Sequence, residues 1–165
     1  MLQSLLNRVR TLSESLQSGS AVRRVLLTRE AEILESQREQ LFEGKRSDGE
    51  DIRPYYSEDL KPGGYFNSAE SAGRYAAWKE DISPYSAGRN PDAPNLYING
   101  RFHSELAVDF GADTVAVIGG TGYARGIVAK YGLSTFGLSP ERWNEIFQNG
   151  ALADLIEETK QILYE

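Results

Sequence analysis

The sequence predicts an α+β domain, in which a small antiparallel sheet of three to five strands is flanked by a long helix in the N-terminal half and by a C-terminal helix. Apolar residues recur at intervals of three and four over residues 21–43 and again near the end of the chain, which indicates helices. Apolar and polar residues alternate over residues 102–110, and an apolar run follows at 114–118, which indicates strands. A length of 165 residues suits one domain of ordinary size.

An amphipathic helix is expected to begin the chain. Its apolar residues, at helical spacing, are Leu2, Leu5, Leu6, Val9, Leu12 and Leu16. Ser18, Gly19 and Ser20 follow as a flexible break. We therefore divide the chain into an N-terminal amphipathic helix over residues 1–19 and a single α+β domain over residues 20–165.

The second helical pattern runs over residues 21–43 and ends at Gly44, because glycine is the residue most favoured just after a helix. Its middle is mostly polar. We expect it to bury only a narrow stripe, either against the sheet or against a partner subunit.

A shorter helix is predicted over residues 68–82, where Asn67 and Glu70 have the spacing of a capping box. Turn residues and prolines interrupt the chain on both sides of it. We expect irregular loops there, at residues 44–66 and 83–95, and such long loops are usually functional or mobile.

The strands over residues 102–110 and 114–118 are separated by a short reversal at 111–113, which predicts an antiparallel hairpin. The dipeptide Asn99-Gly100 tolerates the positive φ angles of a tight turn and could add a further strand at residues 96–98.

Helices are expected again in the last third of the chain. A short helix or irregular segment extends from Gly122 to about Gly132, and Ser139 before Pro140 is a helix start. The core stripe of the C-terminal helix consists of Leu152, Leu155, Ile156, Ile162 and Leu163.

Composition excludes several classes of function. The chain has no cysteine and a single histidine, His103, so disulfides, thiolate catalysis and zinc clusters are excluded, and we expect no metal and no cofactor. The net charge is −6, whereas proteins that mainly bind the phosphate backbone of nucleic acids are positively charged. We therefore expect no sequence-specific nucleic-acid binding. No apolar run approaches the roughly 20 residues that span a bilayer, and the first residues lack the pattern of a secretory signal. We expect neither a membrane protein nor a secreted one.

The glycines after the second strand, Gly120, Gly122 and Gly126, superficially imitate a dinucleotide-binding turn. The sequence after Gly132 turns into a helix instead of the second parallel strand that such a site needs. We expect these glycines to let a loop cross the end of the sheet.

His103 and Glu105 lie two positions apart on one face of the predicted strand. A small enzyme that uses His103 as a base is therefore an alternative. A histidine on the surface or at an interface is the favoured interpretation, because no nucleophile accompanies it.

Tyrosines gather in or beside the two predicted loops, where they are mixed with arginine, proline and glycine. Tyrosine and arginine are enriched at protein interfaces, although these rings could equally pack on their own sheet. The residues expected to contact neighbouring subunits are Tyr55, Tyr56, Tyr85, Arg89, Tyr97, Arg101 and His103.

The order of short motifs over roughly residues 28–165 resembles that of the tail-completion and virion-morphogenesis proteins of long-tailed bacteriophages and prophages. The matching positions are Asp48-Gly49 with residues 54–57, residues 94–106, the strand at 114–118, Tyr123-Ala124, Tyr131-Gly132 and residues 136–143. The N-terminal helix and the helix over 68–82 depart from the pattern.

The resemblance implies a non-enzymatic head-tail joining subunit that assembles as a ring between capsid and tail. Its expected partners are copies of itself and neck or tail-tube proteins, in the virion after assembly and in the host cytoplasm before it. DNA is expected to pass through the ring, and the acidic chain suits that role. A small host regulatory or immunity module that binds one partner remains an alternative.

Overall fold

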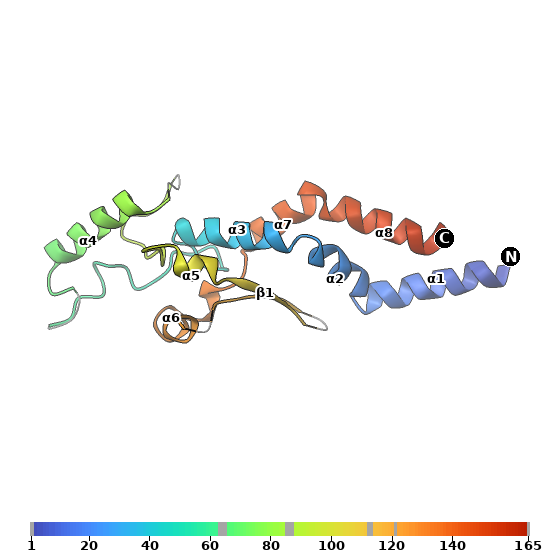
Figure 1. Ribbon diagram of the computed structural model, residues 1–165, viewed down its shortest axis with the longest axis horizontal. Coiled ribbons are helices and arrows are strands. Elements are labelled where there is room, and N and C mark those ends of the chain that lie inside the picture. The colour runs from blue at the N-terminus through green and yellow to red at the C-terminus, as the bar shows by residue number, and fades with distance from the viewer. Residues whose placement is uncertain (1, 63–65, 85–87, 112–113, 121, 165) are drawn as a thin grey trace.

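The computed structural model describes residues 2–62, 66–84, 88–111, 114–120 and 122–164. The molecule is elongated (Figure 1). Two helices form an arm at one end, a body that holds the sheet lies in the middle, and a single outer helix, α4, lies at the other end.

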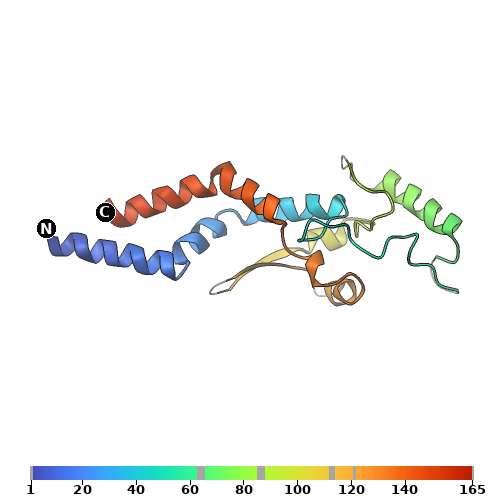
Figure 2. The ribbon, with the colours of Figure 1, turned by 180° about the vertical axis from the view of Figure 1, so that it is seen from behind.

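The arm consists of α1 (Leu2–Gln17) and α8 (Leu152–Tyr164), which lie side by side although they come from opposite ends of the chain (Figures 1 and 2). The predicted N-terminal helix is confirmed. Gly19 has a left-handed backbone, with φ 70°, and turns the chain into α2 (Ser20–Leu27), which packs against both arm helices. The predicted break is thus a tight turn between two helices.

The single helix predicted over residues 21–43 is wrong in its middle, because the chain forms α2 and then a separate helix, α3 (Glu30–Phe42). At the corner, the Thr28 hydroxyl donates a hydrogen bond of 2.7 Å to the backbone carbonyl three residues earlier, which competes with a continuing helix. Arg29 then reaches Asp154 of α8 at 2.6 Å. This ion pair holds α3 against the base of the arm.

The described residues contain a sheet of two antiparallel strands, β1 (Ala107–Phe110) and β2 (Val115–Ile118), where three to five strands were predicted. Val108 pairs with Val117, and α3 packs against β1. The protein therefore combines helices with an antiparallel hairpin. Residues 112–113 of the predicted reversal lie outside the described residues.

The strand predicted to begin at Phe102 is wrong in its first half, and so is the turn between strands at Asn99 and Gly100. Gly100 has a φ of 78° and precedes a one-turn helix, α5 (Arg101–Ser104). Phe102 and His103 are adjacent and both buried. A helical turn allows this, whereas a strand with one buried face exposes every second residue.

The outer helix α4 (Ala69–Ile82) confirms the helix predicted over this segment. Its cap is one residue later than predicted from Asn67 and Glu70. The Ser68 hydroxyl accepts from the Ser71 backbone amide, and the Ser71 hydroxyl accepts from the Ser68 amide, each at 3.2 Å. The box is therefore formed by two serines.

Three helical segments complete the chain before α8. They are α6 (Ala124–Tyr131), a short 3-10 helix (Leu133–Thr135) and α7 (Pro140–Ile146). Ser139 caps α7 as predicted, and a wider turn at Phe147–Ala151 joins α7 to α8.

Two apolar clusters hold these elements together. The main core lies in the body and includes Val25, Leu26, Ile33, Leu41, Ile52, Phe102, Leu106, Val117, Leu138 and Ile146. A smaller outer cluster joins α4 to the loop before it, through Tyr56, Phe66, Ala72, Ala76 and Tyr75. The Tyr56 ring lies 4.9 Å from that of Tyr75 and 5.8 Å from that of Phe66, between centroids.

Two buried glutamines join α3 to the chain between α6 and α7. The Oε1 atoms of Gln37 and Gln40 accept hydrogen bonds of 2.8 Å from the backbone amides of Gly137 and Ser139, respectively. Gln40 Nε2 also donates to the Gly137 carbonyl at 2.9 Å. The buried polar backbone of this segment is thereby paired with side chains.

The two loops predicted to be irregular contain neither a helix nor a named strand in their described parts. Asp51 links them, because its carboxylate pairs with Lys45 at 2.7 Å and accepts hydrogen bonds from the Tyr55 hydroxyl at 2.7 Å and from Asn90 Nδ2 at 3.1 Å. Burial of Asp51 opposes ionisation, but these three donors outweigh it and lower the pKa of Asp51 to about 2.

Candidate functional site

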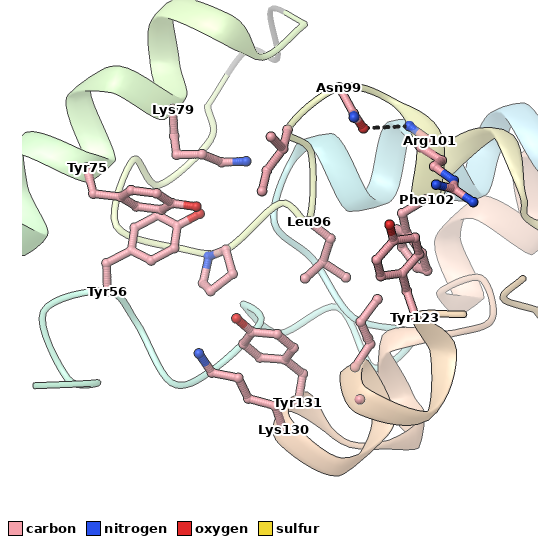
Figure 3. A pocket seen from close by; sticks show the side chains of 14 residues that line it. Tyr56, Tyr75, Lys79, Leu96, Asn99, Arg101, Phe102, Tyr123, Lys130 and Tyr131 are labelled. Atoms are coloured by element: carbon pink, nitrogen blue, oxygen red, sulfur yellow. Dashed lines mark hydrogen bonds between the residues drawn. The ribbon is translucent and has the colours of Figure 1, made fainter. Parts of the chain in front are cut away.

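A pocket of about 460 Å³ lies where the body meets the outer helix (Figure 3). Its walls come from α4, α5, α6 and the loop at residues 94–99. Tyr56 and Tyr75 on its wall belong to the outer cluster, whereas Leu96 and Phe102 pack with the main core. The pocket thus separates the two clusters, and its volume is in the range of small-molecule sites.

Aromatic and branched aliphatic side chains form most of the wall. They include Tyr56, Tyr75, Tyr123, Tyr131, Leu96, Ile98 and Ile127. Leu96 has a φ of 57°, a left-handed backbone that is uncommon for a residue with a branched side chain. Backbone strain of this kind is concentrated at ligand sites.

Lys79 brings a positive charge to this apolar pocket. Ala72, Ala76 and Lys79 are spaced by four and three residues, so they share the buried face of α4, and Lys79 is 1% exposed. Figure 3 shows its side chain extending from α4 into the pocket. Burial, aided by the charge of Arg89, lowers the pKa of Lys79 to about 8.

The other two cations on the wall each have a carboxylate of their own. Arg101 pairs with Glu105 at 3.0 Å, and Lys130 pairs with Asp59 at 2.6 Å. No carboxylate among the described residues forms an ion pair with Lys79. The pocket therefore presents one uncompensated positive charge to any ligand that enters it.

His103 lies next to this pocket and is 3% exposed, so the expectation of a surface histidine is wrong. Its ring stacks on that of Phe42, with 4.6 Å between the centroids. Burial and the charge of Lys79 lower the pKa of His103 to about 4, and the nearby backbone of Asn95 opposes this only in part. Glu105 pairs with Arg101 and not with His103, so the geometry gives no support to a base held by Glu105.

The residues expected to contact neighbours are dispersed. Tyr56 and Arg101 line the pocket, Tyr97 packs edge-on against Phe42, and Tyr55 is half-buried and donates to Asp51. The Arg89 side chain is nearly buried and pairs with Glu80 at 2.7 Å, while Tyr85 lies outside the described residues. Sequence reasoning missed Lys79, whose spacing from Ala72 and Ala76 was the available signal.

Two glycines after the second strand, Gly119 and Gly120, allow close packing, whereas a Cβ atom at Gly122 or Gly126 would meet no atom within 4 Å. A Cβ atom at Gly120 would lie 2.4 Å from the Cβ of Glu105, and one at Gly119 would lie 2.8 Å from the Phe136 ring. The chain continues from α6 into a 3-10 helix and α7, so no second parallel strand follows in the described part.

The chain matches no model of a protein family, no curated protein and no solved structure. Within the described ranges, no group of three or more histidine and acidic residues could hold a metal ion. No helix in those ranges is both long and apolar enough to cross a membrane. The function is therefore inferred from the exposed apolar surface of the arm and from the pocket around Lys79.

Proposed function

We propose that this chain is a non-enzymatic assembly subunit, acting in tail completion or in the neck of a long-tailed bacteriophage. It would assemble as a ring between capsid and tail and contact neck or tail-tube proteins. The phage context comes from the order of sequence motifs. The observation that supports assembly is the apolar surface of the arm.

Helix α1 carries most of that surface. Leu5, Leu6, Val9 and Leu16 are between 45% and 54% exposed, although they follow the spacing of a buried stripe. On α8, Leu152 and Ile156 are each 48% exposed, and none of the described residues of that helix is fully buried.

An arm of two helices has no second layer to cover this stripe. Stable folds bury an apolar helix face against another element, and contiguous exposed apolar surface usually marks an interaction site. We propose that a second copy of the chain or a neck protein supplies the missing layer. The edges of the two-stranded sheet would likewise pair with strands of neighbouring subunits.

The proposed ring would occupy the virion, and its free subunits the host cytoplasm. DNA would pass through it without sequence-specific contact, for which a net charge of −6 is favourable because it limits adhesion to phosphates. A strongly basic lumen in the assembled ring would contradict this part of the proposal.

Light scattering after size-exclusion chromatography tests the role of the arm. The wild-type chain is expected to form complexes alone or when mixed with neck or tail-tube proteins. The double variant Leu6→Glu and Val9→Glu should abolish them, because it places two charges on the exposed stripe.

The matched control is the double variant Gln3→Glu and Gln17→Glu, which adds the same charge at exposed polar positions of α1 and should still assemble. Circular dichroism should show that both variants keep their helices. A wild-type chain that stays monomeric with every neighbour, or a Leu6 and Val9 variant that assembles normally, would contradict the proposal.

A further inference from the structure

We infer that the pocket between the body and the outer helix binds a small organic acid, which carries one carboxylate on an aromatic or branched aliphatic group, with the carboxylate paired to Lys79. The pocket is lined by residues of α4, α5 and α6, and these helices lie away from the arm (Figure 1). This ligand would bind whether or not the chain assembles as proposed.

The unpaired charge of Lys79 is the first reason. A buried ammonium group without a counter-ion is costly, because it loses its hydration and gains no ion pair in return. Lys79 is 1% exposed, and its charged neighbour Arg89 adds repulsion. A ligand carboxylate would supply the missing partner.

The single free charge also limits the ligand. Arg101 and Lys130 are already paired with Glu105 and Asp59, so they offer little additional attraction to a polyanion. A ligand with one negative charge matches Lys79, whereas a di- or triphosphate would leave charges without partners in an apolar pocket.

The walls determine the rest of the ligand. Tyrosine rings and aliphatic side chains surround the space into which Lys79 extends (Figure 3). Planar or branched apolar groups pack on such walls, and aromatic rings also stack there. The volume of about 460 Å³ holds a small molecule. The deep position of Lys79 favours a small molecule over an acidic side chain on a folded partner.

Isothermal titration calorimetry with a matched pair of probes tests this inference. The probes are 2-naphthylacetate and its neutral counterpart 2-(2-naphthyl)ethanol, titrated into the full chain at pH 7. A charge-assisted ion pair should make the acid bind about 10- to 100-fold more tightly than the alcohol.

Lys79→Met should remove this preference, so that acid and alcohol bind with similar affinity. Lys160→Met is the matched control, because Lys160 is an exposed lysine on the arm, paired with Glu157, and its loss should leave both affinities unchanged. Retained binding of the alcohol to Lys79→Met shows that the variant still forms the pocket.

The pH dependence gives a second readout. Arg89 and His103 lie near Lys79, and the other titratable groups on the pocket wall are Tyr56, Tyr75, Arg101, Tyr123, Lys130 and Tyr131. The pKa of Lys79 is lowered to about 8, so this lysine loses its charge as the pH rises past 8. Affinity for the acid should therefore fall about tenfold between pH 7 and pH 9.5, while affinity for the alcohol stays constant.

Equal affinities of the wild-type chain for acid and alcohol would overturn the inference, and so would an absence of binding by both. An acid preference that survives in Lys79→Met would also overturn it, because the carboxylate would then be bound elsewhere.

Discussion

The body and the arm contain apolar residues in similar patterns, but they bury them to different extents. In the body, Ile33, Leu41 and Ile52 are completely buried, and Ile146 is 2% exposed. In the arm, leucines at helical spacing remain about half exposed. Helical periodicity therefore identifies an apolar face without stating whether this chain or another one covers it.

This difference in burial suggests different roles for the body and the arm. In the body, residues of α2, α3, α5, α7 and the hairpin form one core. In the arm, substitutions of the half-exposed apolar residues should change the free energy of unfolding only slightly. Mutations should accordingly affect folding in the body and association in the arm.

The largest expected effect is the loss of a core side chain. Leu41→Ala should lower the free energy of unfolding by about 4 kcal/mol, because it removes buried apolar area and leaves a cavity. Leu6→Ala in the arm should change it by less than about 0.5 kcal/mol. Urea unfolding followed by circular dichroism compares the two, and similar losses would show that the arm is part of the folding core.

Mild acid should weaken the body through His103. Its pKa is lowered to about 4 in the folded state, so the unfolded chain binds a proton first, and stability is lost as pH falls below about 6.5. Unfolding at pH 5 should require about 2 kcal/mol less than at pH 7.

His103→Phe should remove most of this pH dependence, because phenylalanine keeps the stacking on Phe42 and cannot be protonated. The chain has one histidine, so its imidazole resonances in NMR report the titration directly. A midpoint near 6.5 in the folded protein would refute the expected burial effect.

The smallest effect is expected where the arm meets the body. Asp154→Asn removes the ion pair with Arg29 and should cost about 0.5 kcal/mol, because the Asp154 side chain is half exposed and screened by solvent. Faster amide hydrogen exchange confined to α8 is the expected signature. Faster exchange throughout the body would show instead that this pair supports the core.

The helices with clear caps could be predicted from sequence. Pro140 after Ser139 gave the start of α7, and Gly44 gave the end of α3. The corner at Thr28 and Arg29 was not predicted. One of its contacts is local, from the Thr28 hydroxyl to a backbone carbonyl, but the other joins Arg29 to Asp154, more than a hundred residues later. Local spacing contains no information about such a partner.

The sequence did not predict the helical turn at Phe102 or the role of Lys79, and the reasons are related. Phe102, His103 and Glu105 fit an alternating pattern, but burial of two adjacent rings made a helical turn the better solution. Lys79 was not singled out from the sequence. Its spacing from Ala72 and Ala76 places it on the same face of α4, but the absence of a counter-ion cannot be read from one helix. That absence depends on residues 94–99 and α6, which form other walls of the pocket.

The glutamine contacts of α3 restrict how the chain can vary in length. Gln37 and Gln40 are one helical turn apart, and they select the amides of Gly137 and Ser139, two positions apart. Adding or deleting one amino acid between these two amides would move one amide away from its glutamine acceptor. Apolar side chains can adjust to a small shift, but a hydrogen bond of fixed geometry cannot. Insertions and deletions should therefore be rare in this short stretch, even though it has no regular secondary structure.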